Sequence, residues 1–285
     1  MFEKIKQYFS LVRFAHTVFC MPFALAGFFW AIHSCGGFTW ILLLQVIGCM
    51  VFARNTAMGF NRYLDRDVDA KNPRTSQREI PAGKISPRNA LIFVIINALL
   101  FVTVTFTINR LVFFLSPVAI FVVMFYSYTK RFTSLCHFVL GCGMALAPLG
   151  AYLAVCGEFS LVAVLYFVLV LSWGGGFDII YSLQDAQFDT EQNLHSVPQK
   201  FGIKRSLTLS ILAHVVTGIT VLLLGYFQNA GVFYAIGASI FLLLLVRQHT
   251  IVKADDLSKV TIAFGTFNGI ASVIFAIFNI LDIML

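Results

Sequence analysis

Residues 38–69 read FTWILLLQVIGCMVFARNTAMGF and then NRYLDRDVD, an apolar run that ends in three aspartates. The apolar part has the length of a helix that crosses the hydrocarbon core of a bilayer, about 17–25 residues. Asn61, Asp65 and Asp69 are spaced by four, so a helix that continues the run places them on one face. Carboxylates beside a membrane span are costly and mark a functional site by default. The stretch therefore predicts a membrane helix with a polar site at one end.

A second stretch of the chain has the same spacing. Tyr181, Asp185 and Asp189 follow another apolar run, and each lies 120 residues after its counterpart in the first stretch. Asp178 places a further acid just before this trio. The matched spacing predicts two acidic helix faces of related structure.

The composition is that of an integral membrane protein. Of the 285 residues 59% are hydrophobic and 12% are charged, and the mean hydropathy is +0.86. Apolar stretches of sufficient length predict nine transmembrane helices, at about 14–33, 38–60, 89–109, 111–129, 134–156, 159–177, 206–227, 230–249 and 260–284. The two long polar segments, 61–88 and 178–205, are expected to be loops that cap a cavity, and two ordinary exposed loops are the alternative.

The offset of 120 residues also predicts the organisation of the fold. We expect one all-α domain over residues 1–285, built from two four-helix repeats and an added helix. The repeats are expected at about 14–129 and 134–249, and the extra helix at about 260–284. Such a fold brings the acidic stretches opposite each other at a central cavity that is open to the cytoplasm.

The basic residues predict the orientation. With the N-terminus inside, Arg110 falls outside and Arg54 within a span, which leaves 18 of the 20 lysines and arginines on the inner side. This bias agrees with the positive-inside rule for an odd number of spans. The N-terminus and both acidic stretches are then cytoplasmic, and we expect the protein in the inner membrane of a bacterium. The net charge of +7 is explained by these inner lysines and arginines and therefore reports the orientation in the membrane. No basic cluster in the sequence suggests a nucleic-acid partner.

The acidic residues suit a hard divalent cation. Mg²⁺ takes oxygen ligands, and in phosphate sites it binds one or two carboxylates together with phosphate oxygens. One cluster in each stretch predicts two Mg²⁺ ions that together hold a diphosphate. The predicted ligands are Asp65, Asp69, Asp185, Asp189 and Asn61. Asp67 breaks the spacing and is left out, and the alternative is that the acids only pair with nearby arginines.

Three basic residues are candidates for substrate binding. Arg54 lies seven residues before Asn61, two turns back on the same face, so it points into the bundle. Its guanidinium can bind a carboxylate or a diphosphate, and a structural ion pair is the alternative. Lys130 and Arg131 end the fourth span on the cytoplasmic side, where they can neutralise a diphosphate or serve only as topology signals.

The other polar residues of the spans have simpler interpretations. His16, Gln45, Asn97 and Asn268 are expected to form hydrogen bonds between helices. No cysteine has the paired spacing of a metal site, so all six are interpreted as small apolar packing residues. They are Cys20, Cys35, Cys49, Cys136, Cys142 and Cys156.

The ordered motifs resemble those of the UbiA superfamily of intramembrane aromatic prenyltransferases, along essentially the whole chain. The first motif is Asn61-x3-Asp65-x3-Asp69, followed by Arg74-Thr75 and Arg78-x2-Pro81-x-Gly83. The second is Asp178-x2-Tyr181-x3-Asp185-x3-Asp189. The segment Tyr128-Thr129-Lys130-Arg131-Phe132-Thr133 also resembles part of the family pattern.

The resemblance implies nine helices around a central cavity and Mg²⁺-dependent transfer of an isoprenoid chain from its diphosphate to an aromatic acceptor. It implies that the four motif aspartates bind Mg²⁺ with help from Asn61 and Asp178. Arg66, Lys130 and Arg131 match positions that bind the diphosphate, and Arg66 is counted with the catalytic residues. Arg74, Arg78 and Tyr181 are expected to contact the substrates. The expected partners are a polyprenyl diphosphate, the aromatic acceptor and membrane lipid.

Two acceptors fit the resemblance. The motifs are most similar to 4-hydroxybenzoate polyprenyltransferases of ubiquinone synthesis. The opening Arg13-Phe14-Ala15-His16-Thr17-Val18-Phe19 is more similar to prenyltransferases of the futalosine route to menaquinone, whose acceptor is 1,4-dihydroxy-6-naphthoate.

Two other classes of membrane protein also carry acidic faces. A CDP-alcohol phosphatidyltransferase has Asp-Gly and Ala-Arg before a single acidic motif, whereas this chain has two motifs without that lead. A cation transporter usually has its acids near the midplane of the bilayer, whereas here they lie at the ends of the spans. The transporter remains the alternative to an enzyme.

Overall fold

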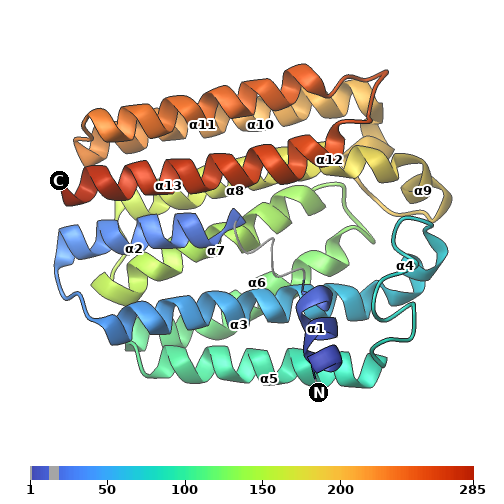
Figure 1. Cartoon of the computed structure of the whole chain (residues 1–285), viewed down its shortest axis with the longest axis horizontal. Helices are drawn as coiled ribbons and strands as arrows, with labels where there is room; N and C mark the ends of the chain where they lie inside the picture. The colour runs from blue at the N-terminus through green and yellow to red at the C-terminus, as the bar shows by residue number, and fades with distance from the viewer. Residues whose placement is uncertain (1, 13–18) are drawn as a thin grey trace.

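A computed structural model describes residues 2–12 and 19–285, with the side chains of residues 2–5 left out (Figure 1). Residues 13–18 are outside the described part. The expected hydrogen bond of His16 therefore lies outside the described residues, as do most of the opening segment and the beginning of the span predicted at 14–33. All the long elements are helices, and they lie side by side along one axis (Figure 1). The prediction of an all-α membrane fold is confirmed.

Eight helical segments of the described chain are long and apolar enough to cross a membrane. They are α3 (Trp40–Leu64), α5 (Pro87–Phe106), α6 (Arg110–Thr129), α7 (Cys136–Cys156), α8 (Leu161–Ser182, continuing to Glu191 through α9), α10 (Val197–Gln228), α11 (Val232–Ile251) and the segment Val260–Met284. That last segment consists of α12 (Val260–Ile262), a π-helical turn, η3 (Ala263–Phe267), and α13 (Asn268–Met284). The helix α2 (Met21–Cys35) is apolar but shorter. These helices correspond to the nine predicted spans.

The two polar segments contain more helix than expected. After α3 the chain forms the short helix α4 (Arg66–Lys71) and then turns as far as Pro87. After α8 it forms a 3₁₀ turn, η2 (Leu183–Asp185), and the short helix α9 (Ala186–Glu191). The prediction of a loop up to residue 205 was wrong, because α10 already begins at Val197. The Ser196 side chain accepts a hydrogen bond from Gln199 N and Pro198 stands in the first turn, which is a strong start for a helix. Gly202, with φ +74°, then bends it.

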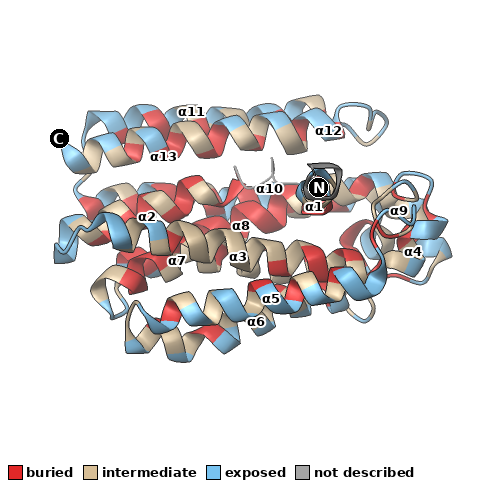
Figure 2. Ribbon diagram, turned by 60° about the horizontal axis from the view of Figure 1, so that its bottom comes forward, coloured by how far each residue is buried: buried red, intermediate tan, exposed pale blue. Residues whose placement is uncertain are grey.

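The helix α8 is at the centre of the bundle and is buried along most of its length, whereas α5 and α6 expose large apolar side chains (Figure 2). Exposed apolar side chains suit contact with lipid. Around α8 glycines allow close packing: a Cβ at Gly141 of α7 would lie 2.4 Å from the carbonyl oxygen of Leu171. Between α2 and α7, a Cβ at Gly27 would likewise lie 2.6 Å from the carbonyl oxygen of Pro148. Small residues at helix contacts are typical of membrane bundles.

The lone polar residues of the described spans form the expected hydrogen bonds between helices. Asn97 accepts from Asn55 at 3.0 Å, and Gln45 donates to Thr107 at 2.9 Å. The Asn268 amide accepts from the Trp173 indole at 2.9 Å. These predictions are confirmed.

The interpretation of all six cysteines as packing residues was wrong for two of them. Cys35 and Cys156 form a disulfide with their Cα atoms 5.7 Å apart, across 121 residues of sequence. They end α2 and α7, at the end of the bundle away from α4 and α9 (Figure 1). No local spacing signals this pair, because only the packing of α2 on α7 brings the two residues together. The other four cysteines are free thiols.

We expect the disulfide to stabilise the bundle, since it closes a long loop in the unfolded chain. The variant Cys35→Ser should lower the free energy of unfolding by about 2–4 kcal/mol, measured as a fall in midpoint temperature in detergent. Cys142→Ser, which removes a free thiol, is the matched control and should leave the midpoint unchanged. Equal midpoints for Cys35→Ser and the unsubstituted protein would contradict the expectation.

Candidate active site

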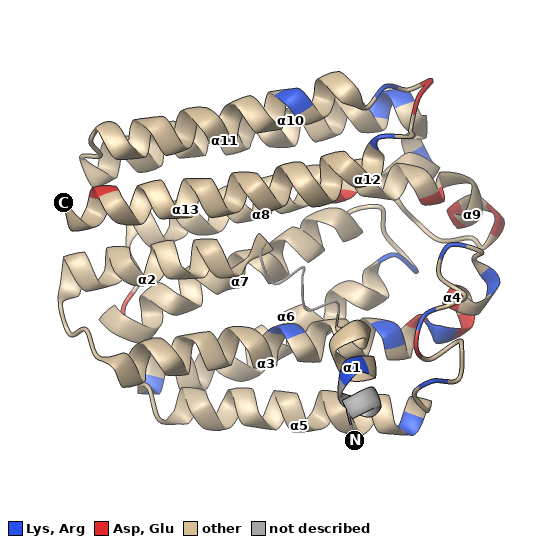
Figure 3. Cartoon of the chain, in the orientation of Figure 1, with Lys and Arg blue, Asp and Glu red and all other residues tan. Residues whose placement is uncertain are grey.

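Most of the charged residues of the described chain gather at one end of the bundle, where α4 and α9 lie (Figure 3). The opposite end has few charges, among them Arg110, Glu158 and Asp282. Both predicted acidic stretches therefore lie at the same end of the molecule.

The middle aspartate of each motif lies at a break between a long helix and a short one. Asp65 ends α3 and precedes α4, with φ −89° and ψ 4°. Asp185 precedes α9 and has nearly the same backbone, with φ −104° and ψ 3°. The sequence predicts one continuous helix through each motif, and the structure corrects this. This backbone region is sparsely populated and common among active-site residues.

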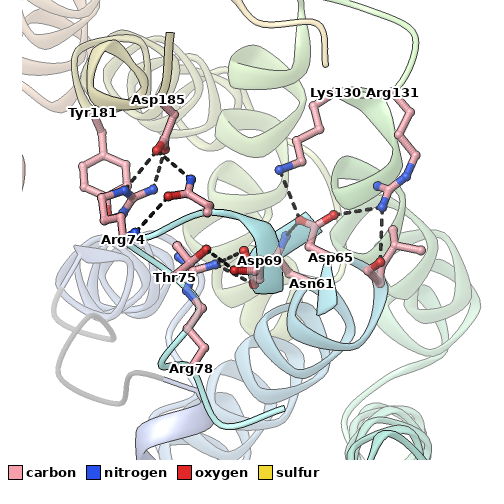
Figure 4. Close-up of polar contacts among 12 residues, drawn as sticks. Asn61, Asp65, Asp69, Arg74, Thr75, Arg78, Lys130, Arg131, Tyr181 and Asp185 are labelled. Atoms are coloured by element: carbon pink, nitrogen blue, oxygen red, sulfur yellow. Dashed lines mark hydrogen bonds and ion pairs between the residues drawn. The ribbon is translucent and has the colours of Figure 1, made fainter. Parts of the chain in front are cut away.

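Asp65 is buried and contacts three side chains (Figure 4). The Asn61 amide donates to it at 2.9 Å, Arg131 donates at 3.0 Å, and the Lys130 ammonium lies 3.4 Å away. Burial of a carboxylate is costly unless it is paired, and two cations at the end of α6 offset that cost. The predicted set of Asn61, Asp65, Lys130 and Arg131 is thus brought together.

Asp69 is also buried, and its partner comes from the turns after α4 (Figure 4). Arg78 donates to both of its carboxylate oxygens, at 2.7 and 2.8 Å. The Thr75 hydroxyl donates to the backbone carbonyl of Asp69 at 3.0 Å, which fixes the turn that carries Arg78.

Asp185 belongs to the second motif but receives its partners from the first half of the chain. Arg74 forms an ion pair with it through Nη2 and donates through Nε at 3.0 Å, while Asn72 donates at 3.2 Å. Arg74 also donates to the Tyr181 hydroxyl at 2.8 Å (Figure 4). Burial alone would lower the pKa of Arg74, but the hydrogen bonds with Asp185 and Tyr181 outweigh it and raise the pKa. Arg74 therefore links the two motifs as a permanent cation.

Asp178 has a partner that the sequence interpretation missed. His137, at the start of α7, lies with Nδ1 2.7 Å from the Asp178 carboxylate. The backbone N–H of Val197 donates to His137 Nε2 at 3.2 Å, so Nδ1 carries the proton that points at Asp178. Asp189, the last acid of the motif, is buried nearby and lines the same cavity. A lone histidine in a span has no local feature that identifies its partner.

These side chains form the polar end of a cavity of about 530 Å³. All four motif aspartates line it, together with Asn61, Arg74, Arg78, Lys130, Asp178 and Tyr181. Tyr126, Asn72 and Phe264 also line it and were not predicted. The rest of the cavity wall is mainly apolar, so charged groups and apolar surface meet in one cavity.

Arg54 lies on the cavity wall as predicted, farther from the polar end. Its Nε atom is buried and has no hydrogen-bond partner among the described residues. No ion pair joins Arg54 to a motif aspartate within the described part of the chain, so a structural ion pair is not supported. A buried guanidinium nitrogen without a partner is costly and suits an anionic ligand.

Arg66 does not line this cavity. It donates to the Tyr63 carbonyl at 2.8 Å and lies 3.5 Å from the exposed carboxylate of Asp67. Its expected role in binding diphosphate therefore has no support from its position in this structure. Asp67 points to solvent, in agreement with its exclusion from the metal set.

The donor atoms around the cavity suit Mg²⁺. Within the described residues, no three histidine, cysteine, aspartate or glutamate side chains meet closely enough to hold a metal by themselves. Mg²⁺ does not require this, because it keeps waters and binds one or two carboxylates together with substrate phosphates. Asp65, Asp69, Asp185 and Asp189 all line the cavity, and their carboxylates would supply such ligands.

The fold and this site define a class: a helical integral membrane protein with paired acidic motifs and basic residues at one end of an apolar cavity. The chain belongs to the UbiA prenyltransferase family, whose model matches residues 20–275. It is therefore a membrane-embedded prenyltransferase.

Similar proteins agree with this assignment. The chain is 25% identical over 279 residues to a 4-hydroxybenzoate octaprenyltransferase of Francisella tularensis subsp. mediasiatica, covering 96% of this chain and 97% of that one. It is 28% identical over 236 residues to the enzyme of the same name from Aeromonas salmonicida, with coverages of 83% and 81%. The structure resembles the apo UbiA homologue of Aeropyrum pernix K1 with a TM-score of 0.85 and 28% identity, over 95% and 98% of the two chains. A UbiA homologue of Archaeoglobus fulgidus bound to GPP and Mg²⁺ has the same fold, with a TM-score of 0.75, 20% identity, and coverages of 98% and 100%.

Proposed function

We propose that this protein transfers a polyprenyl chain from its diphosphate to the ring of an aromatic hydroxy acid, 4-hydroxybenzoate or 1,4-dihydroxy-6-naphthoate. The observation that carries the proposal is the meeting of two acidic motifs with Arg74, Arg78 and Lys130 at the polar end of one apolar cavity, where Arg131 also pairs with Asp65. The names of the relatives support 4-hydroxybenzoate as the first acceptor to test. The product would then enter respiratory quinone synthesis.

The ion pairs around the motif aspartates prepare the site for a diphosphate. Each basic side chain that neutralises an aspartate is also a charge-assisted hydrogen-bond donor suited to a diphosphate oxygen, and the motif aspartates would hold the metal. Arg78 at Asp69 and Arg74 at Asp185 are placed on opposite motifs, so they can hold the two ends of the leaving group. When bound, Mg²⁺ would supply charge neutralisation for that leaving group, and a relative bound to GPP and Mg²⁺ supports the need for the metal. That two ions bind is part of this proposal.

The protein's own contribution to the reaction is to stabilise charge and exclude water. Lys130, Arg131, Arg74 and Arg78 stabilise the negative charge that builds on the diphosphate as the allylic carbon–oxygen bond breaks. The apolar cavity keeps water away from the allylic cation that forms. The ring carbon beside the acceptor hydroxyl then forms the new carbon–carbon bond, and the ring loses a proton to restore aromaticity.

Arg54 is the proposed binding residue for the acceptor carboxylate. Its side chain lies on α3 eleven residues before Asp65, which is about 16 Å along the helix axis. This separation leaves room for the reacting ends of the two substrates between the diphosphate end and the guanidinium. Both candidate acceptors carry a carboxylate, so Arg54 selects the class of acceptor and not the size of its ring.

The disulfide supports the proposed orientation. Disulfides persist in oxidising compartments, and Cys35–Cys156 lies at the end of the bundle opposite the acidic motifs. We therefore propose that this end faces the outside of the inner membrane. The active-site end then faces the cytoplasm, as the distribution of lysine and arginine also predicts.

Transfer activity tests the proposed function. We expect purified protein with Mg²⁺, geranyl diphosphate and each acceptor to form a prenylated product detected by mass spectrometry, and chelation with EDTA to abolish it. Asp65→Ala and Asp185→Ala should each lower kcat by at least 100-fold, since each removes a carboxylate that faces the cavity. Asp67→Ala is the matched control and should retain full activity, because its carboxylate is exposed.

Full activity of folded Asp65→Ala or Asp185→Ala would refute the proposed site. Consumption of the diphosphate without a prenylated product would show that the acceptor is wrong. Uptake of Mg²⁺ into vesicles without any consumption of diphosphate would favour the cation transporter instead.

The role of Arg54 is tested by separating the two Michaelis constants. Arg54→Leu should raise the KM for the acceptor by at least 30-fold, because the loss of a buried charged partner costs about 2–5 kcal/mol. The KM for the prenyl diphosphate should change less than threefold. Arg247→Leu, which removes an exposed arginine of α11, is the control. A rise confined to the KM of the diphosphate would show that Arg54 binds the other substrate.

The orientation is tested by thiol labelling of intact cells. In a background with the four free cysteines replaced by serine, a cysteine at Val232 should react with a membrane-impermeant maleimide. A cysteine at Ser258, which is exposed in the turn before α12 at the active-site end, should react only after the cells are permeabilised. The reverse pattern would overturn the orientation.

A further inference from the structure

The first helix of the chain runs across the bundle instead of along it. This helix, α1 (Phe2–Leu11), contacts α3 and crosses the direction of the long helices (Figure 1, Figure 2). Because the long helices cross the membrane, an element that runs across them lies along the membrane surface. Helices that lie in this way bind the boundary between the headgroups and the acyl chains of a bilayer.

The contacts of α1 place it near the active-site end. Leu11 is fully buried in one cluster with Ala90, and the centroid of the Tyr8 ring lies 5.0 Å from that of Phe93. Ala90 and Phe93 belong to the first two turns of α5, which begins beside the polar end of the bundle. The helix α1 therefore lies where that end meets the bilayer.

The same helix contacts the segment that follows Arg78. Leu11 packs in the same cluster with Ile80, and the Ser10 hydroxyl donates a hydrogen bond to the Glu79 carboxylate. Glu79 and Ile80 follow Arg78 directly in the chain, and Arg78 forms an ion pair with a motif aspartate. Packing and a hydrogen bond thus join α1 to the part of the first polar segment that completes the candidate active site.

The surroundings of α1 expose apolar and basic side chains together. Phe9 is 52% exposed. Lys6 of α1, Lys84 of the first polar segment and Arg88 of α5 are also exposed, and no ion pair joins them to another residue of the described chain. Figure 3 shows basic residues both on α1 and beside the start of α5. An apolar side chain can enter the acyl region while cations contact anionic headgroups, so this surface is complementary to an anionic bilayer.

We propose that Lys6, Lys84 and Arg88 bind anionic phospholipid headgroups, and that this contact holds the segment 79–85 in the observed position. Each basic residue near an anionic surface adds to the attraction, and the effect falls off within a Debye length of about 10 Å at 0.1 M salt. Anionic lipid therefore stabilises α1 and the segment joined to it, and with them the position of Arg78. The inference concerns a lipid partner and does not depend on the identity of either substrate.

Hydrogen exchange of the protein in nanodiscs tests this proposal without any need for activity. The segment 79–85 contains three reporter amides that donate to backbone carbonyls: Ala82 to Arg78 at 2.9 Å, Gly83 to Ile80 at 3.0 Å and Ile85 to Glu79 at 3.0 Å. We expect these amides to exchange about fivefold more slowly in phosphatidylcholine discs with about 40% phosphatidylglycerol than in phosphatidylcholine alone. A salt concentration of about 0.5 M should remove most of the difference by screening.

Two sets of substitutions separate this surface from the general positive charge of the active-site end. The test variant combines Lys6→Gln, Lys84→Gln and Arg88→Gln, and it should exchange at the same rate in both kinds of disc. The matched control removes three exposed cations at the start of α10, through Lys200→Gln, Lys204→Gln and Arg205→Gln. It should retain the fivefold difference. Glutamine has a helix propensity close to that of lysine and arginine, so both variants should fold.

Equal exchange rates of the unsubstituted protein in the two lipids would overturn the proposal. A difference that persists in the test variant, or disappears in the control, would show that the lipid acts elsewhere and would also overturn it. Midpoint temperatures confirm that each variant is folded. Failure of the proposed transfer reaction is detected separately, as the absence of a prenylated product from the unsubstituted protein.

Discussion

The structure depends on the neutralisation of carboxylates at the edge of an apolar bundle. Asp65, Asp69 and Asp189 are buried, and an isolated buried carboxylate is strongly unfavourable. At Asp65 and Asp69 the fold offsets this cost with cations from two places in the chain: Lys130 and Arg131 after α6, and Arg78 in the turns after α4, where Arg74 also pairs with Asp185. The same cations are what a diphosphate requires. The need to stabilise the ligand-free protein and the need to bind a highly charged substrate are therefore met by the same side chains.

The ion pair between Arg74 and Asp185 has a special place in this arrangement. It joins the first polar segment to the second motif, and Asn72 and Tyr181 strengthen the connection. Removal of either partner would leave the other half of the site with an uncompensated charge. The two motifs consequently form one site, although they are far apart in sequence.

Glycine and alanine serve two opposite purposes in the same helix. One face of α7 uses Gly141 to approach α8, and Pro148 on the same helix contacts α2 at Gly27. The other face, which includes Gly143 and Gly150, borders the cavity. The residue types on the two faces are alike, and only the position of the neighbouring helices distinguishes close packing from open space.

Much of the molecule follows from the sequence by itself. Hydropathy over windows of bilayer length determined the spans, because a helix is the economical way to satisfy backbone hydrogen bonds in lipid. The spacing of four identified Asp65, Asp69, Asp185 and Asp189, because helical periodicity places such residues on one face. The sequence also predicted the hydrogen bonds between helices for Asn97, Gln45 and Asn268, since a polar group in a span needs a partner.

The tertiary structure decided which residues meet. His137 with Asp178, Asn72 with Asp185, and the Cys35–Cys156 disulfide join residues that are 41 to 121 positions apart. The tertiary structure also turned Arg66 away from the cavity and broke the helix at Asp65 and Asp185. The physical reason is that helix formation is governed by neighbours within one or two turns, whereas ion pairs, disulfides and cavities are governed by how whole helices pack. That packing depends on the shapes of all the helices together, which no local spacing encodes.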